Sequence, residues 1–541
     1  MNIWGNNFMA IITGTTNNDI LTGTSGDDTF LPYGVTSGIT GLQPPDWMSG
    51  GNGGDTYDLR ASIGSDPVHH YIIDDNGTDG AIDRIEGAGE LIHTASFGYI
   101  GFATAVRDGD DLVIVTPYKP HRFRDPSQPS YEITIVDHFA GEAVEIMVAG
   151  GVTYQLSTGS IGSGLADIMA GTNFDDVYKG KGGADYMTGN DGNDTLVGGG
   201  GDDYLFGGTG NDILKGNAGS DRIYGGTGDD TAIGGNGNDR LELEDGDDTG
   251  RGGGGDDYIY GQDGNDRLVG GGGVDMMSGG RGDDTMLGGK GSDTYRYGYD
   301  LDGLGSLSPA GHDIVKDNGD TPAWNSFDRI QLFGFYGPSD ASAGAAFARL
   351  DVARVGQDMV ITTDGGTGSI TAKNQFGADK FAIEELEFSA GYWSSIRFKI
   401  LDGNKIDIGD DRNLNNTYLS EYNELLFGTD GNDQVFGDAG TNFIWLGAGS
   451  DTLIYKESDA ERLGSLGGGI ANDIVMDFNL NDDMMDFTEM GITMANLTIG
   501  ESASGNALVH WDSPVWYEIS DIYIELRGIS ASELTADHFI F

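Results

Sequence analysis

Aspartate recurs at every ninth position over a long central stretch of the sequence, and carboxylates at so regular a spacing could bind metal ions. The stretch from Gly162 to Arg296 reads as fifteen consecutive nonapeptides of the form GGxGxDxUx, in which U is a large apolar residue. Position six is aspartate in all fifteen, and position eight is large and apolar in thirteen, failing only at Ala232 and Gly250. The aspartates are Asp167, Asp176, Asp185, Asp194, Asp203, Asp212, Asp221, Asp230, Asp239, Asp248, Asp257, Asp266, Asp275, Asp284 and Asp293. A solvated Gly/Asp-rich linker has no need of an apolar residue at a fixed spacing, so the pattern predicts an ordered repeat.

The residue types around each aspartate point to calcium. Glycine at positions one, two and four lets the backbone adopt positive φ and turn its carbonyl oxygens toward an ion. Calcium accepts carbonyl and carboxylate oxygens in a flexible six- to eight-fold geometry, which suits loops that offer one aspartate each. We therefore expect ions between loops stacked 18 residues apart, as for Asp185 and Asp203, and fifteen units allow about 13 such sites.

The elements that must position these loops are very short strands. The three residues xUx of each unit predict a strand with one inward apolar side chain, so two units make an 18-residue coil with a thin core. So thin a core offsets little of the entropy lost in ordering many glycines, and ion binding has to supply the rest. The unit from Leu243 to Arg251 lacks both the first glycine and the core residue. A bend or a missing ion is expected there.

This repeat resembles that of the RTX (repeats-in-toxin) family, whose nonapeptides form a calcium-binding parallel β-roll. Shorter pieces of it occur near both ends of the chain. We expect further calcium ligands, at fewer and weaker sites, in these short arrays: Asp19, Asp28, Asp55, Asp433 and Asp451. In the second of them, Asn442 stands where the repeat has aspartate.

Two similar β-rich segments flank the long array. Asp83-Arg-Ile-Glu86 parallels Asp328-Arg-Ile-Gln331, and Asp111-Leu-Val-Ile114 parallels Asp358-Met-Val-Ile361. Alternating apolar runs between Gly and Asp predict strands in both copies, and the match indicates an internal duplication. The copies resemble the haemolysin-type calcium-binding related domain, which implies an extension of the β-roll and no catalytic role.

The predicted fold class is all-β, a parallel β-roll solenoid flanked by β-rich modules and closed by a C-terminal β-sandwich-like segment. The predicted segments are 1–58 with short RTX units, 59–157 as the first β module, 158–297 as the long β-roll, 298–400 as the second β module, 401–456 as a short array, and 457–541 as the C-terminal β segment. The last of these resembles the segment that closes serralysin-type C-terminal domains.

Composition excludes several classes of function. The formal net charge of −58 disfavours nucleic acid and anionic lipid as partners. The absence of cysteine excludes disulfides, thiolate metal sites and cysteine nucleophiles. Neither an HExxH nor a GxSxG motif occurs, which removes the protease and lipase activities often joined to such arrays. No run of 18 apolar residues predicts a membrane span.

The two ends of the chain predict the route of export. Residues 1–12 have no basic segment followed by a long apolar run, so a Sec signal is not expected. The end, Leu534-Thr-Ala-Asp-His-Phe-Ile-Phe541, places an acidic residue before a few apolar ones. It resembles the uncleaved type I secretion signal of RTX proteins, which implies type I secretion machinery as a partner and an extracellular location. An ordinary last strand is the alternative.

Together these features predict a secreted, non-enzymatic protein that folds on extracellular calcium. The role expected is structural or adhesive, in a surface layer, filament or biofilm matrix, through self-association or through contacts with the cell surface or polysaccharide. Two alternatives stay open. One is an enzyme acting on polysaccharide through a site concealed in the duplicated modules, and the other is a soluble calcium scavenger or carbohydrate-binding protein.

Overall fold

A computed structural model describes residues 160–297 without a break and shorter stretches on either side. Before residue 160 the described residues are the strands between 11 and 156. After 297 they are 311–316, 328–333, 350–363, 368–373, 375–376, 383, 385–389, 395–402, 405–406, 423–436, 440–455, 471–511 and 522–541. The chain forms two compact units, Met1–Asp275 and Met276–Phe541, and each is described by itself.

The first unit is built from β-strands. Those before the long array are β1 (Ile11–Thr13), β2 (Ile20–Thr22), β3 (Thr29–Leu31), β4 (Asp46–Ser49), β5 (Thr56–Asp58), β6 (His69–Ile73), β7 (Arg84–Glu86), β8 (Ile92–Thr94), β9 (Ile100–Phe102), β10 (Thr104–Asp108), β11 (Asp111–Thr116), β12 (Tyr131–Ile135), β13 (Ile146–Ala149) and β14 (Val152–Leu156). Those within it are β15 (Asp167–Ala170), β16 (Val177–Lys179), β17 (Tyr186–Asp191), β18 (Thr195–Gly200), β19 (Tyr204–Thr209), β20 (Ile213–Ala218), β21 (Arg222–Thr227), β22 (Thr231–Asn236), β23 (Arg240–Asp245), β24 (Thr249–Gly254), β25 (Tyr258–Asp263) and β26 (Arg267–Gly272).

The second unit is also built from strands, with a few short 3-10 helices. Its first strands are β27 (Met276–Arg281), β28 (Thr285–Lys290), β29 (Thr294–Tyr297), β30 (His312–Lys316), β31 (Arg329–Phe333), β32 (Leu350–Val355), β33 (Asp358–Thr363), β34 (Gly368–Ala372), β35 (Glu385–Ser389) and β36 (Ser395–Asp402). Its later strands are β37 (Lys405–Ile406), β38 (Asn423–Phe427), β39 (Gln434–Phe436), β40 (Gly440–Trp445), β41 (Thr452–Ile454), β42 (Ala471–Val475), β43 (Met484–Asp486), β44 (Leu497–Glu501), β45 (Ala507–Trp511), β46 (Ile522–Leu526) and β47 (Phe539–Ile540). The 3-10 helices are η4 (Thr488–Met490), η5 (Met494–Asn496), η6 (Ala531–Glu533) and η7 (Ala536–His538).

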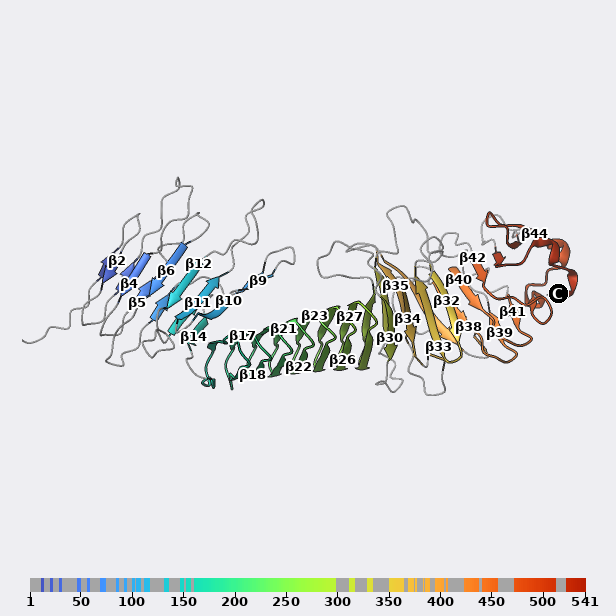
Figure 1. Cartoon of the computed structure of the whole chain (residues 1–541). Coiled ribbons are helices and arrows are strands. Elements are labelled where there is room, and N and C mark those ends of the chain that lie inside the picture. Colours follow the sequence, from blue (N-terminus) through green and yellow to red (C-terminus); the bar gives the residue numbers. More distant parts are fainter. Residues whose placement is uncertain are drawn as a thin grey trace, which may run out of the picture. The chain divides into compact units, whose positions relative to one another are not determined.

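In the first unit the nonapeptides wind into a parallel β-roll, as predicted, with successive strands on alternate sheets (Figure 1). The strands β15, β17, β19, β21, β23 and β25 form one sheet, and β16, β18, β20, β22, β24 and β26 form the other. Each strand pairs with the strand two units on, so that Leu205 lies beside Ile223 in the first sheet and Leu196 beside Leu214 in the second. Residues that pair between neighbouring strands of one sheet are therefore 18 positions apart, which is two nonapeptides of the sequence.

The strands are longer than the sequence predicts. The three positions xUx predict three-residue strands, whereas each strand from β17 to β28 is six residues long. Pairing resumes after the first glycine of the next unit, so that Asn190 lies beside Gly208 and Asp191 beside Thr209. Position two takes this path at positive φ even where it is not glycine, at 76° for Asn190.

The position-eight side chains form the thin core, as predicted. Those described are buried without exception, from Met169 at 0% exposed to Tyr178 at 9%, and the small Ala232 is buried as well. The core is one side chain wide between the two sheets, and it does not extend under the loops at either edge of the roll. The loops therefore need another source of stability.

The two flanking segments share one strand topology. In the first copy β10, β11 and β12 are antiparallel neighbours and β12 is parallel to β6. In the second copy β32, β33 and β34 are antiparallel neighbours and β34 is parallel to β30. Likewise β7–β13–β14 and β31–β35–β36 each join a parallel pair to an antiparallel one. Each copy thus adds antiparallel hairpins to sheets that also contain parallel coil strands.

The chain ends in a compact apolar segment. Side chains that include Phe487, Val509, Ile524 and Phe539 bury a common core between the last strands. The last strand, β47, pairs with β43, where Phe539 lies beside Met485. Among the residues described, no helix has the length and apolar character needed to cross a membrane.

Candidate calcium sites

The aspartates of the array form a ladder along each edge of the roll. The N–H of each aspartate donates a hydrogen bond to Oδ1 of the aspartate 18 residues later, at 2.8 Å from Asp185 to Asp203 and 2.7 Å from Asp194 to Asp212. In the first unit these bonds run from Asp167 to Asp275 at 2.7–2.9 Å. The structure therefore brings together the aspartates that the sequence pairs at 18 residues.

The second carboxylate oxygen is buried and has no hydrogen-bond partner in the interior coils. Asp203 is 0% exposed and Asp194 is 1% exposed. Oδ2 lacks a partner in Asp185, Asp194, Asp203, Asp212, Asp221, Asp230, Asp239, Asp248, Asp257 and Asp451. A buried anionic oxygen without a donor is costly, and a bound cation is the usual remedy.

The first glycine of the unit makes room for this oxygen. A Cβ placed on Gly180 would overlap Oδ2 of Asp185 and would lie 2.7 Å from the carbonyl oxygen of Gly198 in the next coil. The carboxylate and a backbone carbonyl therefore converge on a space that only glycine leaves open.

Burial changes the acidity of the ladder. Loss of water around the buried carboxylate raises the pKa of Asp203 to about 8, although the N–H of Asp185 lowers it and nearby aspartates raise it further. Burial likewise raises the pKa of Asp185 to about 7 and that of Asp194 to about 6. Without a cation, Asp203 is mostly protonated at neutral pH and Asp185 is protonated in part.

The donor set fits calcium. In the described part of the chain, no three His, Cys, Asp or Glu side chains gather as a metal cluster. What converges instead is one carboxylate per loop together with backbone carbonyl oxygens, which is a set of hard oxygen ligands. Asp185 and its equivalents would hold the ion, and a divalent cation would favour the ionised carboxylate and offset its burial.

Apart from Asp167 and Asp176 in the first coil, the other predicted ligands divide into three groups. Asp266, Asp275, Asp284 and Asp293 are buried in the same position as the interior aspartates. Asp433 and Asp451 stack in the short array, where the N–H of Asp433 donates to Oδ1 of Asp451 at 2.8 Å. The remaining three, Asp19, Asp28 and Asp55, lie outside the described residues.

Four aspartates outside the set of predicted ligands extend the ladders in the second unit. The N–H of Asp284 donates to Asp313 at 3.2 Å, that of Asp293 to Asp328 at 2.7 Å, and that of Asp451 to Asp483 at 3.1 Å. Asp473 accepts from the side chain of Asn442 at 2.9 Å. Insertions lengthen the spacing to between 29 and 35 residues, which hides them from a search at 18. Asp328-Arg-Ile and Asp483-Met-Met still carry the DxU pattern.

A second ladder uses the residue before each aspartate. The N–H of Asn193 donates to Oδ1 of Asp175 at 2.8 Å, and that of Asn211 donates to Oδ1 of Asn193 at 2.7 Å. These bonds point toward the start of the chain, opposite to those of the aspartate ladder. Position five is unspecified in the GGxGxDxUx pattern, although it is Asp, Asn or Ser in twelve of the fifteen units.

The irregular unit from Leu243 to Arg251 keeps the regular register. Its strand β24 pairs with β22 and β26 at the usual spacing, and the N–H of Asp230 donates to Oδ1 of Asp248 at 2.7 Å. Leu243 is fully buried, and its Cδ1 lies 3.0 Å from where a Cβ of Gly250 would be. The leucine at position one therefore supplies the apolar atoms that the glycine at position eight lacks. The expected bend is absent from the strand pairing.

This compensation predicts strong coupling between the two positions. Leu243→Gly alone should destabilise the roll by about 3 kcal/mol through lost burial and a cavity. Gly250→Leu alone should cost about 1–3 kcal/mol, because its Cβ would lie 2.9 Å from Ile259 and 3.3 Å from Leu268. The double variant restores the regular pattern. Its loss of unfolding free energy, measured by urea unfolding at fixed calcium, should be smaller than the sum of the two single losses by at least about 1 kcal/mol. Additive effects would show that the two side chains do not share one space.

Comparisons with known proteins agree with the repeat. The family model of the RTX calcium-binding nonapeptide repeat (4 copies) matches residues 4–31, 170–205, 206–241, 242–277, 260–295 and 418–453. No curated protein matches the chain.

Two solved structures are similar to parts of the chain. One is the AlgE6R3 subunit of the Azotobacter vinelandii mannuronan C5-epimerase, at 24% identity and a TM-score of 0.14, over 22% of this chain and 73% of that one. The other is the extracellular lipase LipA from Serratia marcescens, at 13% identity and a TM-score of 0.15, over 64% of this chain and 45% of the lipase. At such TM-scores neither likeness bears on activity.

Proposed function

We infer that this calcium-binding RTX β-roll repeat protein folds its coils as calcium enters the stacked loops, and that each interior aspartate supplies a ligand. The partnerless, buried Oδ2 of residues such as Asp185 and Asp203 is the observation that carries the proposal. A net charge of −58 and a thin core oppose compaction of the metal-free chain. Ion binding and folding are then one event.

We further propose that the chain leaves the cell unfolded, by a type I route, and folds outside, where calcium is abundant. The C-terminal residues that resemble an export signal lie in η7 and β47, and Phe539 is buried against the last sheet. Secretion machinery that reads these residues therefore has to meet them before this segment folds. Low calcium inside the cell would favour that order of events.

The role proposed outside the cell is structural or adhesive rather than catalytic. Three described histidines have structural contacts that account for them: His312 with Ser369 at 3.0 Å, His538 with the carbonyl of Leu480 at 3.0 Å, and His510 stacked on Tyr523 at 4.1 Å. An acidic surface that remains negative after the loops are filled offers further calcium a means of bridging neighbouring molecules or the cell surface.

One preparation tests both halves of the proposal. Size-exclusion chromatography with light scattering should give an expanded monomer in EDTA and a compact particle at about 1 mM calcium. At higher calcium, electron microscopy should show regular sheets or filaments. A chain that is fully folded in EDTA would overturn calcium-dependent folding. A compact monomer that never assembles would leave folding intact and overturn the self-assembling role.

A further inference from the structure

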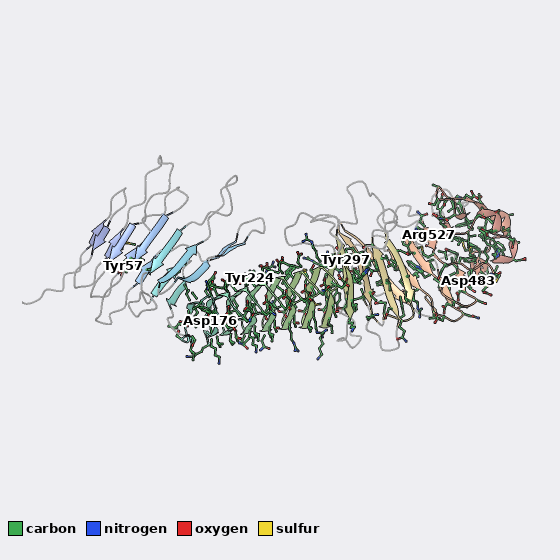
Figure 2. All side chains as sticks on the ribbon, viewed as in Figure 1. Tyr57, Asp176, Tyr224, Tyr297, Asp483 and Arg527 are labelled. Atoms are coloured by element: carbon green, nitrogen blue, oxygen red, sulfur yellow. The ribbon has the colours of Figure 1, made fainter. Side chains whose placement is uncertain are left out.

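The first coil of each described array differs from the coils that follow it. In the long array the two opening units have Ser163 and Thr172 at position two, where later units have glycine or another residue at positive φ. The Ser163 N–H donates to Oδ2 of Asp167 at 2.7 Å, and its hydroxyl donates to the same oxygen at 3.0 Å. Thr172 does the same to Oδ2 of Asp176, at 2.7 Å and 2.8 Å. Figure 2 marks Asp176 at this coil.

The short array opens in the same way. The N–H and the hydroxyl of Thr429 both donate to the carboxylate of Asp433, the hydroxyl at 2.8 Å to Oδ1. The next aspartate on that edge, Asp451, has an Oδ2 without a partner. In both described arrays, the carboxylate of the first coil accepts hydrogen bonds from position two of its own unit, which we call self-paired. In the next coil on the same edge, Oδ2 of the aspartate has no such partner.

Backbone conformation makes the two arrangements mutually exclusive. In interior units position two has φ between 76° and 125°, as in Asn190 and Gly199. A β-branched threonine avoids that region, and Thr172 and Thr429 are not at positive φ. With φ negative, the N–H and hydroxyl of the residue point at the carboxylate that an ion would otherwise hold.

We propose that Ser163, Thr172 and Thr429 close the ion sites of the opening coils, so that Asp167, Asp176 and Asp433 are calcium-free caps rather than ligands. The inference rests on the proposed function, because it divides the aspartates of one ladder into those that take an ion and those that do not. It removes three residues from the ligands that the sequence predicts and places the first ions at Asp185, Asp194 and Asp451.

A self-paired first coil satisfies the carboxylate at the start of an array, where the preceding chain is not a repeat unit. Every interior loop has a neighbour on both sides, whereas the first loop of an array follows a different kind of chain. Serine and threonine satisfy the first carboxylate of each ladder with the same groups that cap a helix. The first ion-binding coil can then form against a coil whose own carboxylate is already paired.

The sequence carries the same signature outside the described residues. Gly14-Thr15 and Gly23-Thr24 open the two N-terminal units, each five residues before Asp19 or Asp28 counted from the glycine. The inference extends to them as a prediction about those two aspartates.

Calcium counting on two matched triple variants of the full chain tests the inference. Equilibrium dialysis against radioactive calcium at saturation gives the ions bound per chain. Asp185→Asn/Asp194→Asn/Asp451→Asn should lose about three ions relative to the unaltered chain, because each removed carboxylate is a ligand. Asp167→Asn/Asp176→Asn/Asp433→Asn should lose none, whatever it costs in stability.

The outcomes separate the two proposals. Equal losses from both triples, with normal binding by the unaltered chain, would overturn the caps and leave calcium-dependent folding standing. An unaltered chain that binds no calcium would overturn the proposed function, and the caps with it.

A single substitution decides the matter if the triple variant fails to fold. Thr172→Gly removes the hydroxyl and permits positive φ, so Asp176 should gain an ion and the count should rise by about one. The control Thr172→Ser keeps the hydroxyl and should leave the count unchanged. An unchanged count in both variants would overturn the inference.

Discussion

Gly210→Ala is expected to raise markedly the calcium concentration that is needed to fold the coils around it. Gly210 occupies position four at a φ of 126°, where a side chain is strained by about 1–3 kcal/mol. Its Cβ would also overlap the carbonyl oxygen of Gly192 and lie 2.6 Å from the carbonyl carbon. Neither backbone can withdraw without breaking the pairing of adjacent coils. We expect a loss of at least about 3 kcal/mol in unfolding free energy.

A glycine ten residues away provides the control. Gly200 occupies position three, and the nearest atom to a Cβ placed on it is the carbonyl oxygen of Lys181, at 3.9 Å. Gly200→Ala should therefore be neutral or should stabilise the roll by up to about 1 kcal/mol, because alanine restricts the unfolded chain. Calcium titrations followed by circular dichroism measure both variants. Similar midpoints for the two would contradict the stacking of Gly210 on Gly192.

Acid is expected to replace calcium in part as the agent that folds the roll. Burial raises the pKa of Asp203 to about 8, that of Asp221 to about 7 and that of Asp239 to about 6, from an ordinary value of 3.8. A raised pKa in the folded state means that the folded chain binds more protons than the unfolded one. The stability of the metal-free roll is therefore greatest below about pH 4 and is lost as the pH rises through about 6 to 8.

With calcium present, acid should have the opposite effect and should destabilise the folded roll. Calcium requires the ionised carboxylate, so protons compete with it, and the calcium needed for folding should rise by up to about tenfold per pH unit below pH 7. Circular dichroism in EDTA at pH 8 and pH 5 tests the first effect, and calcium midpoints at pH 7.5 and pH 6 test the second. Measurements stay above the sequence pI of about 4.1, where the chain would lose solubility. Folding in EDTA that weakens on acidification would contradict the burial of the ladder.

The repeat made most of the roll predictable because its period is also its register. An aspartate at every ninth residue fixes which strands pair, and an apolar residue at position eight fixes which side chains are buried, as for Leu205 and Leu214. The sequence likewise predicts the internal duplication, and the two flanking segments have matching strand pairings.

The features that the sequence did not predict depend on contacts between residues of different units. The ladder of position five appears only when coils are stacked, since Asn193 bonds to a residue 18 positions earlier. Asp313 and Asp328 join the aspartate ladders across insertions that break the period. Leu243 compensates for Gly250 through space, so the unit that seemed weakest in sequence keeps its pairing.

The alternation of strands between two sheets sets a parity rule for how such an array can change length. Within residues 160–275, a strand pairs with the one 18 residues on, while the nonapeptide between them belongs to the opposite sheet and edge. Deleting one nonapeptide would move every later strand of the roll in this stretch to the opposite sheet. Deleting two would only shorten the roll by one coil. The array can therefore change length without exchanging its sheets only by pairs of nonapeptides, although the unit that repeats in the sequence is the single nonapeptide.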